Sequence, residues 1–143
     1  MTDTMENRLM LLLFNNTNFA DVGDATGLRG STTAGSLFLS AHTADPAEAG
    51  TQTTSEVTYT SYARVTVARS AGGFTITANS VSPAAVVTFP TGTGGSGTIT
   101  HFGIGTASSG AGVLLWRGTV TPNIVTGNGI TPSYTVASAV TVD

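Results

Sequence analysis

The first apolar pattern in the chain is an amphipathic segment, DTMENRLMLLLF, at residues 3–14. Its apolar residues recur at helical spacing, and Glu6 follows Asp3 at the spacing of a capping box. Beyond Arg8 the segment is too apolar to stand alone in water. We therefore expect a short helix whose apolar face is covered by the chain's own sheet or by another subunit. The residues expected on that face are Met5, Leu9, Leu12 and Leu13.

After a polar loop at residues 15–35, the pattern changes to the alternation of apolar and polar positions that is typical of strands. Turn residues separate the apolar segments at intervals of roughly 8–15 residues, which predicts many short strands. The expected fold is all-β, a jelly-roll-like β-sandwich of about seven to nine strands with a short N-terminal helix. We expect an N-terminal helix and loop arm over residues 1–35 and a β-sandwich domain over 36–143. The candidate strands are residues 36–42, 62–69, 74–78, 85–90, 98–104, 112–120, 123–125 and 133–142.

The stretch ITHFGIGTASSGAGVLLWRG, residues 99–118, has the glycine density of a phosphate-binding loop. A dinucleotide fingerprint beginning at Gly103 and Gly105 needs a third glycine at position 108, where this chain has Ser108. A Walker loop needs a lysine, and the chain contains none. We interpret the stretch as a β-hairpin whose loop glycines permit positive backbone φ angles.

Charge and composition narrow the classes of partner. Charged side chains make up only 9% of the chain, and the formal net charge is −3. The five basic residues are scattered arginines, so the chain lacks the basic patch that a nucleic-acid partner requires. The absence of cysteine excludes disulfides and thiolate metal sites. The lack of a basic patch leads us to expect no nucleic-acid partner. No apolar run approaches the length of a membrane span, so we expect no membrane partner either.

Residues that could perform catalysis are sparse. His101 with Ser108 or Ser109 would need an acid to form a triad, but no carboxylate side chain lies between Val57 and Val142. Glycoside hydrolysis needs two opposed carboxylates, and the candidate acids lie in predicted loops or in the N-terminal helix. We therefore expect no enzymatic activity and no cofactor.

Two further groups of residues have candidate binding roles. His42, Asp45 and Glu48 offer nitrogen and oxygen ligands at spacings that a metal ion could use. The pattern favours a simple turn with solvated acids after the preceding strand, so we expect no metal. Trp116 is expected in the core, and its neighbour Arg117 also makes it a candidate interface residue.

Several segments together resemble a family of small virion proteins of tailed bacteriophages, which are head-decoration (cement) or tail-fibre-like proteins built as jelly-roll-like β-sandwiches. The resemblance covers most of the chain, and its motifs are structural rather than catalytic. The long polar loop before residue 36 departs from the family pattern. The segments that carry the resemblance are MENRLMLLLF (5–14), LFLSAHTADP (37–46), YARV (62–65), FP (89–90) and GTITHFGI (97–104).

The resemblance implies a structural virion protein without catalytic, cofactor or metal residues. The first hypothesis is a capsid decoration protein, made in the host cytoplasm, that binds the major capsid protein at the capsid surface and stabilises the head. We expect it to self-associate as a homotrimer. The alternative is a tail-fibre or receptor-binding module that contacts host surface glycans. The interface candidates are Met5, Leu9, Leu12, Leu13 and Trp116.

Overall fold

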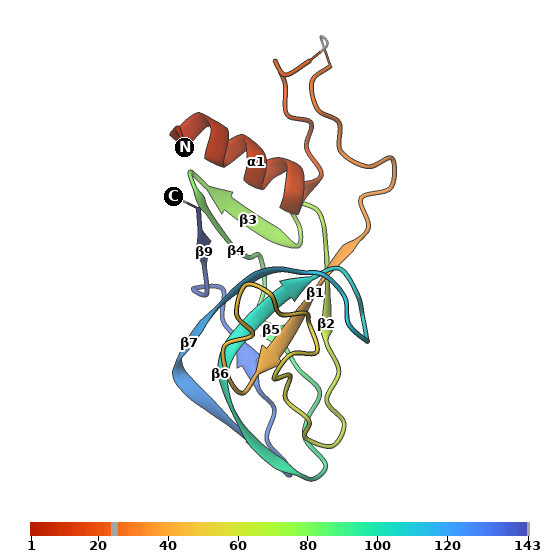
Figure 1. The fold of residues 1–143 in the computed structure, drawn as a ribbon, viewed down its shortest axis with the longest axis vertical. Helices are drawn as coiled ribbons and strands as arrows, with labels where there is room; N and C mark the ends of the chain where they lie inside the picture. The colour runs from red at the N-terminus through yellow and green to blue at the C-terminus, as the bar shows by residue number, and fades with distance from the viewer. Residues whose placement is uncertain (24–25, 143) are drawn as a thin grey trace. The chain divides into compact units, whose positions relative to one another are not determined.

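The computed structural model describes residues 1–23 and 26–142, which contain one α-helix followed by nine β-strands (Figure 1). Asp24 and Asp143, two of the chain's eight acids, lie outside the described residues. The helix and the predominance of strands confirm the predicted all-β class with a short N-terminal helix. The elements are α1 (Asp3–Asn15), β1 (Ser36–His42), β2 (Val65–Ala68), β3 (Phe74–Thr77), β4 (Ser80–Pro83), β5 (Val87–Thr88), β6 (Ser96–Gly105), β7 (Leu114–Gly127), β8 (Ser133–Tyr134) and β9 (Val140–Thr141).

Three sheets contain these strands. The largest has the order β2–β1–β6–β7, and the other two have the orders β3–β4–β9 and β5–β8. The β1–β6, β6–β7, β3–β4, β4–β9 and β5–β8 pairs are antiparallel. The hairpin predicted for the glycine-rich stretch is present, because β6 and β7 pair on either side of its loop.

The strand boundaries match the prediction best where the apolar pattern is strongest. β1 coincides with the predicted strand, whereas β4 was not predicted because its sequence, SVSP, is short and has Val81 as its one β-branched residue. The segments 112–120 and 123–125 belong to one long strand, β7, and the predicted C-terminal strand is divided between β8 and β9.

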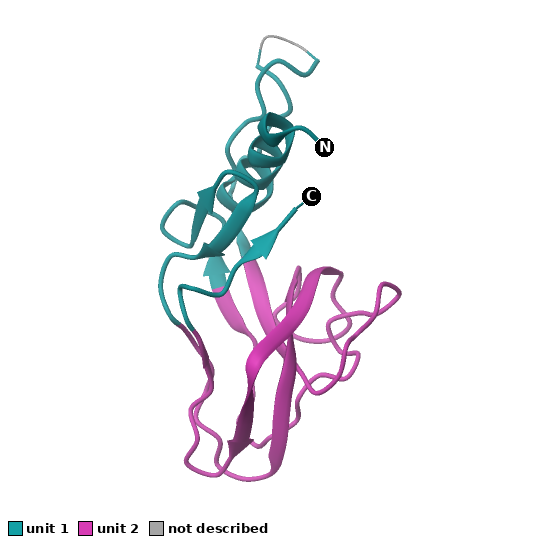
Figure 2. Ribbon diagram, turned by 90° about the vertical axis from the view of Figure 1, so that its left-hand side faces the viewer, with its two compact units in different colours: residues 1–36, 67–86, 135–143 teal, residues 37–66, 87–134 magenta. Residues whose placement is uncertain are grey.

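The chain forms two compact units (Figure 2). Unit 1 consists of residues 1–36, 67–86 and 135–143, and unit 2 consists of residues 37–66 and 87–134. Unit 1 therefore joins the N-terminal helix and loop to segments that the sequence pattern had assigned to the sandwich domain.

In unit 1, α1 packs on the hairpin of β3 and β4 (Figure 1). Its buried residues are Glu6, Met10 and Phe14, which are spaced four residues apart on one face. The Phe14 and Phe74 rings meet edge to face, with centroids 5.0 Å apart. The face turned toward the sheet is therefore not the predicted one, since Met5 is 39% exposed and Leu9, Leu12 and Leu13 are only half-buried.

The N-terminal cap of α1 also differs from the prediction. Thr2 is the N-cap, in an extended conformation, and its hydroxyl accepts a hydrogen bond from the Met5 backbone N–H at 3.4 Å. Asp3 is already helical, so it cannot supply the cap. With the cap one residue earlier than expected, Glu6 falls outside capping-box spacing, and its side chain is buried instead.

In unit 2, the short β5–β8 pair and the residues that follow β5 pack against the larger sheet through aromatic side chains. The Tyr134 ring lies 5.1 Å from Phe89 and 6.4 Å from Phe102 between ring centroids, edge to face in both cases. The Tyr134 hydroxyl donates a hydrogen bond to the Ser40 carbonyl at 3.3 Å. Phe89 and Tyr134 are both buried and belong to the core of unit 2.

The α1 helix is 13 residues long. In the part of the chain that the structure describes, no helix has the length and apolar character that crossing a bilayer requires.

Candidate functional site

The first candidate site is a buried serine–histidine pair on β1. The Ser40 hydroxyl and His42 Nε2 are 2.8 Å apart, and His42 Nδ1 lies 2.8 Å from the Thr54 carbonyl. Because a carbonyl only accepts, Nδ1 carries the proton and Nε2 accepts from Ser40. Burial lowers the pKa of His42, which keeps the ring neutral. The pair resembles a nucleophile and its base, but both residues have no exposed surface, so a substrate cannot reach them as the structure stands.

The side chains of Ser40 and His42 have room because the residue opposite Ser40 on β6 is a glycine, Gly103. A Cβ at Gly103 would lie 2.6 Å from His42 Nε2 and 2.8 Å from a Leu114 methyl carbon. Its φ is not positive, so the glycine is required for close approach rather than for an unusual backbone angle. Of the hairpin glycines that raised the phosphate question, Gly110 does have a positive φ, of 72°. The positive φ predicted for the glycines of the hairpin loop GTASSGA is therefore confirmed at Gly110 and wrong at Gly105.

A second polar cluster fixes the loop between β6 and β7. Arg64 is buried and forms a two-pronged ion pair with Glu56, at 2.7 and 2.8 Å. It also donates to the carbonyls of Ala107 and Gly110, at 2.9 and 2.8 Å. The hydrogen bonds from Arg64 to Glu56 raise the pKa of Arg64. This arginine therefore stays charged and holds the hairpin loop to the neighbouring segment.

The glutamine at position 52 completes the anchoring of that loop. Its side-chain oxygen accepts from the Ala107 N–H at 3.0 Å, and its backbone N–H donates to the Gly112 carbonyl at 3.1 Å. A Cβ on Gly105 or Gly112 would collide with the Gln52 side chain. Together, Gln52 and Arg64 form hydrogen bonds with backbone groups of this loop and hold it in place.

Of the three residues considered as possible metal ligands, His42 is buried, whereas Asp45 and Glu48 are exposed. His42 is buried as described, whereas Asp45 is half exposed and pairs with Arg117 at 2.6 and 2.7 Å. The backbone N–H of Ala47 donates to Asp45, and this bond followed by the Arg117 charge lowers the pKa of the carboxyl. Asp45 and Glu48 are both exposed, as expected for a turn with solvated acids, and Asp45 in addition pairs with Arg117. No group of three or more His, Asp or Glu side chains within residues 1–23 and 26–142 is arranged to hold a metal ion.

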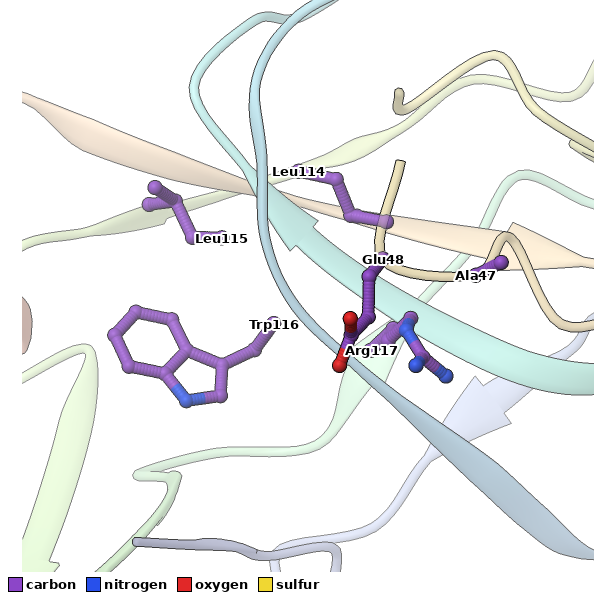
Figure 3. A pocket seen from close by; sticks show the side chains of 6 residues that line it. All are labelled: Ala47, Glu48, Leu114, Leu115, Trp116 and Arg117. Atoms are coloured by element: carbon purple, nitrogen blue, oxygen red, sulfur yellow. The ribbon is translucent and has the colours of Figure 1, made fainter. Parts of the chain in front are cut away.

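Next to this ion pair, unit 2 has a surface hollow of about 420 Å³. In Figure 3 the Trp116 ring points away from Glu48 and Arg117, on the other side of β7. Leu115 is exposed at this point, and it is the extra residue between two β6–β7 pairs, Gly105 with Leu114 and Ile104 with Trp116. The predicted interface residue Trp116 is half-buried. The hollow is lined by Ala47, Glu48, Leu114, Leu115, Trp116 and Arg117.

The residues considered for a catalytic triad do not come together around His101. This residue lies on β6 opposite Thr119, and its Nδ1 is 2.9 Å from the Thr100 hydroxyl. Ser108 and Ser109, the predicted nucleophile candidates, are exposed in the hairpin loop. The structure thus places the catalytic candidates on a strand and in a neighbouring loop, with no carboxylate hydrogen-bonded to His101 among the described contacts.

Comparison with known proteins identifies the family to which the chain belongs. The family model described as podophage GP4 fiber I protein gp80 matches residues 1–141. The chain belongs to this family. It is therefore a bacteriophage virion protein related to fibre proteins, as the sequence resemblance implied at its coarser level. No curated protein matches the chain.

Sequence patterns did not predict the buried polar pairs of unit 2 in this member of the fiber I family. Neither Glu56 with Arg64 nor Ser40 with His42 was predicted as a pair. The alternation in YARVTVAR places Arg64 on the polar side of a strand, yet Arg64 is buried. A signal was available in the glycines of GTITHFGIG, because a glycine within a strand indicates the close approach of another group.

Proposed function

We propose that this chain is a structural building block of a virion fibre, which acts by binding other protein chains and not by catalysis. The observation that carries the proposal is the fibre-family match over residues 1–141. The geometry agrees, because the polar side chains with catalytic potential are engaged in holding unit 2 together. Ser40 with His42 and Glu56 with Arg64 are both hydrogen-bonded pairs. The proposed assembly is a homotrimer without nucleic-acid, membrane or cofactor partners.

Capsid decoration is the second candidate placement. It is favoured by the low charge of the chain, since docking on a protein lattice through apolar contacts needs few charges. In that case the partner is the major capsid protein and the location is the capsid surface. A decoration protein that binds only the assembled lattice would stabilise the head by linkage. The fibre placement is preferred because the matching family is described by a fibre protein.

A receptor-binding role is the most specific form of the fibre proposal. Host surface glycans would then contact the hollow beside Glu48 and Arg117, whose volume of about 420 Å³ lies in the range of small-ligand sites. The Trp116 ring points away from these two side chains (Figure 3). A sugar stacked on Trp116 would therefore not reach Glu48 and Arg117 in the same position.

Labelling of purified virions tests the placement. Antibodies against this chain, imaged by electron microscopy, should bind in small numbers at the tail end of the particle. Antibodies against the major capsid protein provide the control for access to the head. Dense labelling over the head would replace the fibre proposal with capsid decoration. Absence of the chain from washed, intact virions would refute both placements.

A further inference from the structure

The surface hollow of unit 2 contains a hydrogen-bond donor group and an acceptor group that the described residues leave unused. The Arg117 guanidinium binds Asp45 through Nη1 alone, at 2.6 and 2.7 Å. Among residues 1–23 and 26–142, its Nε and Nη2 atoms donate no hydrogen bond. The Glu48 carboxylate has neither a hydrogen bond nor an ion pair within the same residues. Both groups line the hollow on the same side of β7 (Figure 3), where a ligand can reach them.

The turn that carries Glu48 is held in one arrangement. The Ala47 N–H donates to Asp45 Oδ1 at 2.9 Å, and the Gly50 N–H donates to the Ala47 carbonyl at 3.2 Å. Since Asp45 also binds Arg117, one carboxylate positions both the turn and the guanidinium. Binding groups that are fixed before a ligand arrives lose less conformational entropy on binding.

The charges around the hollow favour a neutral ligand. The Ala47 N–H, followed by the charge of Arg117, lowers the pKa of the Asp45 carboxyl, so Asp45 is ionised and balances Arg117. Glu48 adds a further negative charge, which would repel a carboxylate or a phosphate. An ammonium group would face the N–H groups of Arg117, for which it has no acceptor. A purely apolar ligand would cover both charges without replacing their water.

The geometry of the free groups favours adjacent hydroxyls over an amide. The Nε–H and Nη2–H of an arginine point in parallel, so they fit two acceptor oxygens that lie side by side. Two neighbouring hydroxyls of a sugar ring provide such oxygens, and each hydroxyl also has a hydrogen to donate. An amide offers only one oxygen to the guanidinium. A neutral sugar therefore satisfies both Arg117 and Glu48 at once.

We propose that this hollow binds a neutral hexose ring through two adjacent hydroxyl groups. Arg117 donates from Nε and Nη2 to the two hydroxyl oxygens, and the Glu48 carboxylate accepts one hydroxyl hydrogen. Ala47 and Leu114, which also line the hollow, provide apolar contact for the C–H groups of the ring. The inference rests on the fibre proposal, because it names the class of sugar for its glycan-binding form. Several copies in one fibre would strengthen the weak binding of a single site.

An NMR titration of the full chain tests the site with three neutral probes: methyl α-D-mannopyranoside, methyl β-D-galactopyranoside and methyl β-D-glucopyranoside. At least one should shift the Arg117 Nε–H signal and the backbone amide signals of Ala47 and Glu48 in a saturable way. The chain has only five arginines, so the Nε–H signals are few. The methyl uronide of the sugar that binds should bind more weakly, because Glu48 repels its carboxylate. N-methylacetamide, as the amide probe, should cause much smaller shifts.

Two variants test the roles of the free groups, with affinity measured from the Ala47 amide signal. Arg117→Lys keeps the charge beside Asp45 but removes the two parallel N–H groups, so glycoside binding should weaken about tenfold or more. The matched control is Arg8→Lys, which makes the same change in an arginine–aspartate pair of unit 1 and should leave the affinity unchanged. Glu48→Gln should weaken binding of the neutral glycoside and reduce its preference over the uronide. Urea unfolding checks that each variant is folded.

The hexose site would be overturned if none of the three glycosides shifted these signals up to its solubility limit. It would also be overturned by tighter binding of the uronide, by equal shifts with N-methylacetamide, or by equal effects of the Arg117 and Arg8 variants. Labelling of virions at the tail end would still support the fibre placement after any of these results. Labelling over the head would refute that placement while leaving Arg117-dependent sugar binding intact, so the two proposals fail separately.

Discussion

Unit 2 buries polar and charged side chains and pairs them with one another, whereas unit 1 leaves large apolar side chains of its helix near the surface. Arg64 and His42 are buried in unit 2, and each has hydrogen-bond partners there. In unit 1, α1 packs through Met10 and Phe14, while Met5 is 39% exposed. Fully satisfied polar pairs in a low-dielectric interior hold their neighbours in one arrangement. The comparison indicates that polar pairing fixes the interior of unit 2, whereas apolar packing of α1 on β3 and β4 fixes unit 1.

The largest expected effect comes from breaking the buried ion pair of unit 2. Arg64→Met removes the partner of Glu56 and the donors to the hairpin loop. It should lower the free energy of unfolding by about 3–5 kcal/mol, because one member of a buried pair is left without compensation. Urea unfolding followed by circular dichroism measures the change.

The matched control is Arg117→Met, which breaks the half-exposed pair with Asp45. Its cost should be about 0–1 kcal/mol, as is usual for surface pairs. Equal losses in the two variants would contradict the assignment of rigidity to the buried pair.

A glycine substitution tests the close packing above Ser40 and His42. Gly103→Ala places a methyl group 2.6 Å from His42 Nε2, and the fully buried pair has little room to move. We expect a loss of about 1–3 kcal/mol from overpacking. Gly72→Ala is the control, because its Cβ would meet only the Ser70 hydroxyl at 3.7 Å and its φ is not positive. It should be neutral or stabilising by up to about 1 kcal/mol. A Gly103 variant as stable as the Gly72 variant would show that the glycine is not required for packing.

Sequence patterns predicted the positions of some elements but not which side of an element is buried. β1 was placed at its observed boundaries because SLFLSAH has a strong apolar pattern between polar loops. The extent of α1 was predicted to within one residue. Of the two covers expected for the face of Met5, Leu9, Leu12 and Leu13, the chain's own sheet is not the one observed, because Met10 and Phe14 meet the sheet. The stripe of Met5, Leu9 and Leu12 is as apolar as the face of Met10 and Phe14, so periodicity alone could not choose which one meets the sheet.

The candidate site was less predictable because its pairs are made in three dimensions. Arg64 and Glu56 are eight residues apart, but Arg64 also binds the carbonyl of Ala107, 43 residues away. No local pattern specifies that contact. β4 was missed for a related reason, since its short sequence, with a single β-branched residue, becomes a strand through pairing with β3 and β9.

The smallest expected effect is a pH dependence that belongs to unit 2. Both histidines of the chain, His42 and His101, lie in this unit. Burial lowers the pKa of His42 below its ordinary value of 6.5, so between the two values the unfolded chain binds a proton that the folded chain does not. The stabilising contribution of the neutral ring is complete above pH 6.5 and is lost as the pH falls below it. The free energy of unfolding, measured in urea, should therefore decrease on mild acidification.

His42→Gln tests the source of this slope. The variant should be less stable at neutral pH, since it disturbs the hydrogen bonds to Ser40 and Thr54, but its stability should depend less on pH in the same range. Glu56, Arg64 and His101 also act electrostatically on His42, so any charge change among them would alter the slope. An unchanged slope in the His42 variant would show that the buried ring is not its cause.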